Sequence, residues 1–144
     1  MSITEAGVIR VSRLIPVAPA RAFDAWVDPA VACRWLFATP DGEIVRCDID
    51  GRPGGAFVIT DRRDGGDVAH HGTFLEIDRP RRLVFRFSVP KYSSAESTVE
   101  VTVTADGAGA DVTIEGRDVP REWVSQTETG WRDLLGRLED VLQA

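Results

Sequence analysis

Residues 120–142 read PREWVSQTETGWRDLLGRLEDVL and carry the strongest helical pattern in the chain. One face, spaced by three and four residues, consists of Trp123, Thr127, Trp131, Leu134, Leu135, Leu138, Val141 and Leu142. Arginine, aspartate and glutamate occupy the other side, so the segment is predicted to be an amphipathic helix. About 22 residues rising 1.5 Å each span roughly 33 Å. In a chain this small, such a helix must cross a whole sheet.

The middle of the chain is predicted to supply that sheet, because its hydrophobic period is two. The predicted strands are 43–49, 55–62, 68–78, 82–89, 97–105 and 110–116. Short stretches rich in Asp, Gly and Pro separate them, which indicates hairpins and an antiparallel meander. Val99, Val101 and Val103 alternate with polar residues, so one face of the sheet is expected to be buried and the other wetter.

The N-terminal part adds one strand and two short helices. Residues 8–15 are rich in β-branched residues and end at Pro16, as a strand would. Pro19 suits the first turn of a helix, and Asp28-Pro29 ends that helix and begins another. The predicted order is β-α-α, six strands, α. The fold class is therefore α+β, with about six to seven strands around a long C-terminal helix, and residues 1–144 are expected to form one domain.

Composition excludes some partners. The net charge is −6, whereas a nucleic-acid-binding surface is basic. No stretch approaches the ~20 apolar residues that cross a bilayer. Met1 to Gly7 lacks a basic region followed by an apolar run, so no signal peptide and a cytoplasmic location are expected.

Two cysteines, Cys33 and Cys47, lie in a predicted helix and a predicted strand. Buried free thiols are the expected state, with a disulfide as the alternative. Two cysteines are too few for a structural zinc site without histidine. Neither a metal nor a cofactor is predicted.

Several short sequence motifs are spread along nearly the whole chain, from about residue 8 to 142. They are Pro19-x-x-x-Phe23-x-x-Trp26, Asp28-Pro29, Trp35, Arg52-Pro53-Gly54-Gly55-Ala56-Phe57, Gly72-Thr73-Phe74-Leu75-Glu76-Ile77, Pro80, Leu83-Val84-Phe85 and Gly130-Trp131-x-x-Leu134-Leu135-x-x-Leu138. In this order and spacing they resemble the heat-shock protein 90 ATPase activator-like family of the START/Bet v 1-like superfamily.

The resemblance implies a helix-grip fold, in which the long helix packs across the concave face of the sheet and leaves a cavity. Members of the superfamily bind lipids, hormones or polyketides, and some are cyclases, aromatases or self-sacrifice resistance proteins. Co-chaperone members carry an additional N-terminal domain, which is not expected in a sequence of this length. The label therefore describes shape more closely than function.

The residues expected to line such a cavity are mostly aromatic. They are Trp35, Phe57, Phe74, Glu76, Phe85, Arg86, Phe87, Trp123, Thr127 and Trp131. The aromatic members could equally form a closed core. Glu76 is expected to share a face with Phe74 and to pair with Arg86, either at the cavity or as a solvent-facing salt bridge.

His70 and His71 are adjacent in a predicted strand, so their side chains should point to opposite faces. At most one can face the cavity, as a general base or a hydrogen-bond partner of a ligand. Gly130 lies inside the last helix and is expected either to allow close packing or to open space for a ligand.

Three functions remain open from the sequence. The first is non-catalytic binding of an apolar or amphipathic small molecule. The second is an enzyme that uses the same cavity, such as a polyketide cyclase or hydrolase, with His70 or His71, Glu76 and Arg86 as acid–base candidates. The third is a protein-interaction module, linked to a chaperone by the resemblance alone. Whether the protein is an enzyme is left open, with binding favoured because no catalytic motif is legible.

Overall fold

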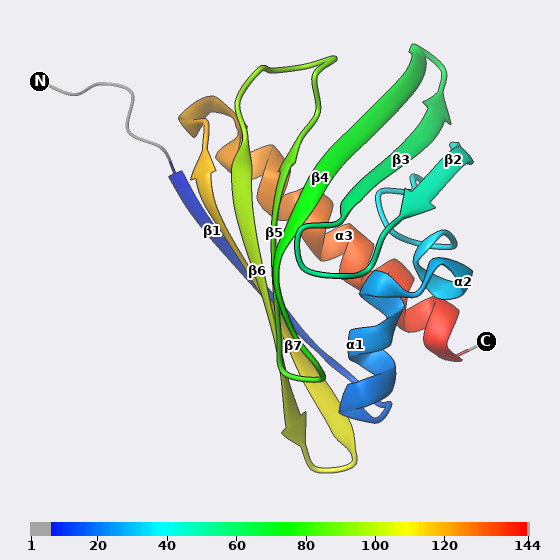
Figure 1. Cartoon of the computed structure of the whole chain (residues 1–144), viewed down its shortest axis with the longest axis vertical. Helices are drawn as coiled ribbons and strands as arrows, with labels where there is room; N and C mark the ends of the chain where they lie inside the picture. Colours follow the sequence, from blue (N-terminus) through cyan, green and yellow to red (C-terminus); the bar gives the residue numbers. More distant parts are fainter. Residues whose placement is uncertain (1–6, 144) are drawn as a thin grey trace, which may run out of the picture.

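A computed structural model describes residues 7–143, so the N-terminal residues in which no signal peptide was predicted lie almost wholly outside it. The seven strands are β1 (Gly7–Ile15), β2 (Glu43–Ile49), β3 (Ala56–Arg63), β4 (Gly66–Asp78), β5 (Arg82–Ser88), β6 (Ser97–Asp106) and β7 (Gly109–Val119). They form one antiparallel sheet in the order β1-β7-β6-β5-β4-β3-β2 (Figure 1). The predicted α+β class and meander are confirmed.

The helices are α1 (Pro19–Val27), α2 (Pro29–Ala32), a 3-10 turn η1 (Arg121–Trp123) and α3 (Val124–Gln143). Both short helices begin with proline, as predicted, and the Asp28 side chain caps α2 by accepting a hydrogen bond from the Ala30 amide at 3.0 Å. Within residues 7–143, no helix combines the length and apolarity needed to cross a membrane.

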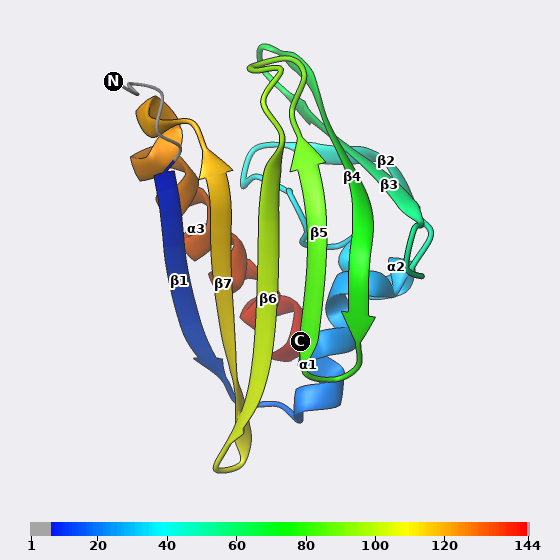
Figure 2. The ribbon, with the colours of Figure 1, turned by 60° about the vertical axis from the view of Figure 1, so that its left-hand side comes forward.

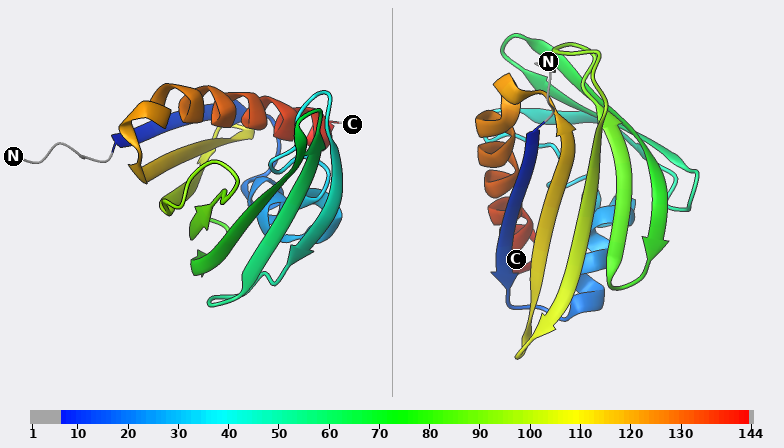
Figure 3. Two further views of the ribbon diagram at one scale, coloured as in Figure 1. Left: turned by 90° about the horizontal axis from the view of Figure 1, so that it is seen from above. Right: turned by 90° about the vertical axis from the view of Figure 1, so that its left-hand side faces the viewer.

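All the helices lie on the concave side of the curved sheet, and its convex side is open to solvent (Figures 2 and 3). The inward face of α3 buries Trp131, Leu135, Leu138 and Leu142. Because α3 packs along β1, the ion pair between Arg13 Nε and Glu139 Oε1 at 2.7 Å ties the helix to that edge strand. The helix-grip arrangement is confirmed.

An aromatic cluster joins α1, the sheet and α3. The Trp26 ring lies 4.8 Å from Trp35, 6.4 Å from Phe85 and 5.8 Å from Trp131, between ring centroids. The indole nitrogen of Trp35 donates a hydrogen bond to the Ala25 carbonyl at 2.9 Å, so its polar atom is satisfied inside the core. The position of Trp131 is therefore fixed from the α1 side as well as from the sheet.

The predicted pair between Glu76 and Arg86 does not form. The register of β4 against β5 shifts between Phe74 and Glu76, so Phe74 is buried while Leu75 and Glu76 are both exposed. Glu76 then lies 3.6 Å from Arg82, and Arg86 lies 3.8 Å from Glu96. A β-bulge moves the following residues out of simple alternation, and this is why Glu76 does not share the buried face of Phe74.

The expectation of free thiols was also wrong, because Cys33 and Cys47 form a disulfide. Cys33 is the C-cap residue of α2, and Cys47 lies in the middle of β2. The bond joins the short helix to an edge strand of the sheet. The disulfide therefore fixes the end of α2 relative to β2, and with it the start of the segment that leads to residues 37–40.

We expect Gly72→Ala to lower the free energy of unfolding by about 1–3 kcal/mol, the usual range for overpacking. Gly72 pairs directly with Phe57 on β3, and an added Cβ would lie 2.1 Å from Phe57 Cζ and 2.8 Å from the Arg86 carbonyl oxygen. Gly65→Ala is the control, since nothing lies within 4 Å of its Cβ position. Urea denaturation of both variants tests this. Equal stabilities would contradict the close contact between Gly72 and the Phe57 ring.

Candidate ligand-binding site

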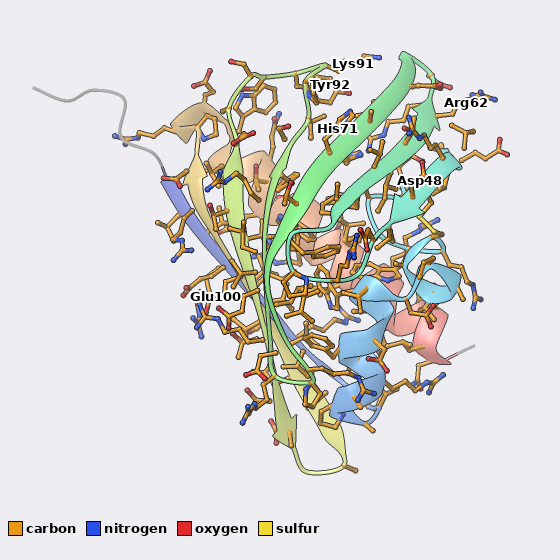
Figure 4. The ribbon with its side chains drawn as sticks, viewed as in Figure 1. Asp48, Arg62, His71, Lys91, Tyr92 and Glu100 are labelled. Atoms are coloured by element: carbon orange, nitrogen blue, oxygen red, sulfur yellow. A yellow bond between two sulfur atoms is a disulfide. The ribbon has the colours of Figure 1, made fainter. Side chains whose placement is uncertain are left out.

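A cavity of about 440 Å³ lies between α3, the sheet and two loops. The segment after α2 contributes Phe37, Ala38, Thr39 and Pro40, and the sheet contributes Arg63, His70, Phe87 and Ser88. The β5–β6 loop contributes Val89, Tyr92, Ser93 and Ala95. Figure 4 shows Tyr92 and Lys91 on this loop, beside the β3–β4 hairpin. The Lys91 ammonium donates to the carbonyl of Gly65 at 3.0 Å, which links the loop to that hairpin.

The α3 wall is a second stripe on the helix, next to the stripe buried in the core. Its main members on α3 are Thr127, Gly130, Leu134 and Arg137, separated by three, four and three residues, and Trp123 of η1 precedes Thr127 by four. This spacing keeps them on one face of the helix. Gly130 lies at the centre of the stripe, and nothing lies within 4 Å of its Cβ position. The missing side chain therefore leaves space in the cavity wall.

Phe37 and His70 stack in the cavity wall. Their ring centroids are 4.3 Å apart and their planes differ by 7°. Phe37 has a φ of 61°, a left-handed conformation that is costly for a bulky residue, and residues strained in this way cluster at functional sites. Its ring also lies 5.6 Å from both Phe87 and Trp131. This strained turn thus joins the loop after α2 to both walls.

His70 is an uncharged hydrogen-bonding group at neutral pH. Its Nδ1 lies 3.2 Å from the Ile59 carbonyl oxygen, so the neutral ring that donates this proton keeps a lone pair on Nε2. Burial lowers the pKa of His70 from 6.5 to about 4, against the opposing effect of the Ile59 carbonyl. His71 on the same strand is exposed (Figure 4).

A buried carboxylate fixes the loop that enters the cavity. Asp61 is fully buried and accepts hydrogen bonds from Thr39 Oγ1 and Arg63 Nε, both at 2.7 Å. Gly42 approaches so closely that an added Cβ would lie 2.6 Å from either carboxylate oxygen. The arrangement holds Thr39 and Arg63, both of which line the cavity, in place.

The structure divides the predicted lining residues into three groups. Phe87, Trp123, Thr127 and Trp131 line the cavity. Trp35, Phe57, Phe74 and Phe85 are buried in the core behind it. Glu76 and Arg86 are exposed and lie outside the cavity. Glu100, which pairs with Arg82 at 3.4 Å, marks the convex face at the left of Figure 4.

Sequence reasoning did not select Phe37, Arg63, Tyr92, Leu134 or Arg137 as lining residues. For Leu134 and Arg137 a signal existed, because they continue the spacing of Trp123, Thr127 and Gly130 on α3. For Phe37 and Tyr92 no local pattern was available, since both lie outside helices and strands of regular period.

The described part of the cavity lining does not gather metal ligands. Among residues 7–143, no three His, Cys, Asp or Glu side chains gather in a way that could hold a metal ion. His70 is the only histidine in the cavity lining of the described residues. The polar groups of the cavity are therefore separate hydrogen-bond donors and acceptors on an apolar wall.

Solved structures share this architecture. CV1439 from Chromobacterium violaceum is 22% identical, with a TM-score of 0.86 over 95% of this chain and 97% of that chain. Mll3558 from Rhizobium loti is 26% identical, with a TM-score of 0.79 over 97% and 99%. DynU16, a protein in the dynemicin biosynthetic locus, is 23% identical, with a TM-score of 0.76 over 95% of this chain and 47% of that chain.

Sequence comparison gives the family. No curated protein sequence matches the chain. The family model described as Activator of Hsp90 ATPase homolog 1-like protein matches residues 16–143. That range includes both helices that follow β1, strands β2 to β7 and α3. The chain belongs to the Activator of Hsp90 ATPase homolog 1-like family.

Proposed function

We propose that this protein binds an apolar or amphipathic small molecule in the cavity between the sheet and α3. The observation that carries the proposal is the cavity itself, whose volume of about 440 Å³ falls in the range typical of small-molecule sites. Its walls include the rings of Phe37, Phe87, Trp123 and Trp131. Such walls favour a ligand that removes apolar surface from water.

The polar groups suit recognition better than proton transfer. A general acid or base works best with a pKa near the working pH, whereas the pKa of His70 is lowered to about 4. The other acid–base candidates, His71, Glu76 and Arg86, lie outside the cavity. A neutral His70 can instead accept a hydrogen bond from a ligand hydroxyl or amide. These facts favour the binder over the cavity enzyme.

The surface also favours a binder over a protein-interaction module. The large exposed apolar residues of the described chain are Val8, Leu14, Val45, Leu75 and Tyr92. They lie on β1, β2, β4 and a loop, and β1 and β2 are opposite edges of the sheet. A protein-binding site usually needs one contiguous apolar patch. The concave cavity is therefore the better candidate.

We expect Gly130→Leu to abolish ligand binding while the protein stays folded. The new side chain enters open space in the cavity wall, and leucine is a better helix former than glycine. The neutral fluorescent probe N-phenyl-1-naphthylamine should bind the natural protein and lose at least about tenfold in affinity for the variant, since filling the cavity removes apolar contact.

Thr129→Leu is the matched control, because Thr129 is exposed on the same helix and does not line the cavity. It should bind the probe as the natural protein does. Native mass spectrometry before and after mild denaturation should also reveal a co-purified apolar molecule. Failure to bind the probe, together with no mass shift after incubation with lipids and aromatic compounds, would refute the proposal.

We expect His70 to make the fold less stable on mild acidification. Its pKa is about 4 in the folded protein and about 6.5 in the unfolded chain. As pH falls below 6.5, the unfolded chain takes up a proton that the folded protein does not. From pH 7.5 to 5, this lowers the free energy of unfolding by about 2 kcal/mol. Urea titrations should show the natural protein losing about 2 kcal/mol more than His70→Gln; equal losses would contradict the buried neutral state.

A further inference from the structure

Arg137 is a charged residue of the cavity lining whose guanidinium has no ion-pair partner among the described residues. It lies on the cavity stripe of α3 and is half-buried. Within residues 7–143, its guanidinium forms no ion pair, and its Nε is enclosed without a hydrogen-bond acceptor. An enclosed donor without an acceptor is destabilising, and buried polar groups are normally satisfied by protein, water or ligand.

Arg137 differs from the other unsatisfied atoms among the described residues, which are Trp26 Nε1 and Asp61 Oδ1. Trp26 is sealed in the aromatic core, and the Asp61 carboxylate already accepts two hydrogen bonds. Neither residue lines the cavity. Among the described residues, Arg137 is the one whose enclosed, unsatisfied atom belongs to a side chain that lines the cavity.

Two other charged side chains line the cavity, Arg63 and Asp133. Arg63 Nε donates to the buried Asp61, and within residues 7–143 its terminal nitrogens form no ion pair of their own. Asp133 is one turn before Arg137 on α3, yet it lies beyond ion-pair distance and is itself exposed. The lining thus carries more positive than negative charge, in a chain with a net charge of −6.

We propose that the ligand is an acid, with an apolar body against the aromatic wall and a carboxylate that accepts hydrogen bonds from Arg137. A carboxylate matches the planar guanidinium, and charge-assisted bonds of this kind are about twice as strong as neutral ones. The proposal rests on the proposed function, because it specifies the ligand of the same cavity. A straight-chain acid and an aromatic acid share the chemistry that Arg137 recognises.

The test is displacement of N-phenyl-1-naphthylamine by two matched pairs, decanoate with decanol and 2-naphthoate with 2-naphthalenemethanol. For each pair, the ratio of alcohol to acid inhibition constants is measured in the natural protein and in Arg137→Gln. Acid and alcohol differ in water solubility, but this difference is the same for both proteins and cancels when the two ratios are compared. We expect the ratio to fall about tenfold or more in Arg137→Gln for at least one pair. The pair that responds identifies a chain or a ring as the apolar body.

Arg132→Gln is the matched control, since it removes the same charge from α3 at an exposed position outside the cavity. Its ratio should equal that of the natural protein, and Arg137→Lys should be intermediate because it keeps only the charge. Unchanged affinity for the neutral probe shows that each variant is folded. If the probe binds but Arg137→Gln alters neither ratio, this inference is wrong and the proposed function stands. If the natural protein neither binds the probe nor shows a mass shift after incubation with lipids and aromatic compounds, the proposed function itself fails.

Discussion

The long C-terminal helix, α3, is too narrow to cover the concave face of a seven-stranded sheet. Strands about 4.8 Å apart make a sheet about 29 Å wide, whereas a helix with its side chains is about 10–12 Å across. α3 packs along β1, and α1 packs against β6 and β7. The remaining concave surface, around His70 of β4 and Phe87 of β5, borders the cavity. The free space is thus a geometric result of the fold.

Trp131 lies where the filled and unfilled parts of the concave face meet. Its ring contacts Trp26 and Phe85 on the core side and Phe37 and Phe87 on the cavity side. The same side chain therefore stabilises the fold and shapes the site. The neighbours of Trp131 come from α1, β5 and the loop after α2. This part of the cavity wall is therefore held in place by the close packing of the core.

The fold could be predicted because the long helix and several strands have a clear period, and Pro, Gly and Asp mark the boundaries of the others. Pro19, Pro29 and Pro120 begin or precede helices, and alternation marks the strands. The site could be predicted only in part, because alternation tells which face a residue shares but not what covers that face. Phe85 and Phe87 lie two apart on the same side of β5, yet the first is core and the second faces the cavity.

The remaining errors concern features that depend on tertiary contacts. The bulge at Leu75 and the Cys33–Cys47 bond are set by how β4 meets β5 and how α2 meets β2. The hydrophobic period of a single segment carries no information on how that segment meets another one, so it could predict neither the bulge nor the disulfide. The same reason explains why Arg137 was assigned to the polar side of α3, since nothing in its own helix indicates that a cavity lies beside it.

The two stripes of α3 have different roles, one in packing the helix on the sheet and the other in lining the cavity. Leu135, Leu138 and Leu142 hold it on the sheet, while Thr127, Leu134 and Arg137 face the cavity. A substitution on the second stripe alters the shape or charge offered to a ligand and leaves the core contacts in place. Duplicated genes of this architecture can therefore diverge in what they bind through single changes along one helix, with little loss of stability at each step.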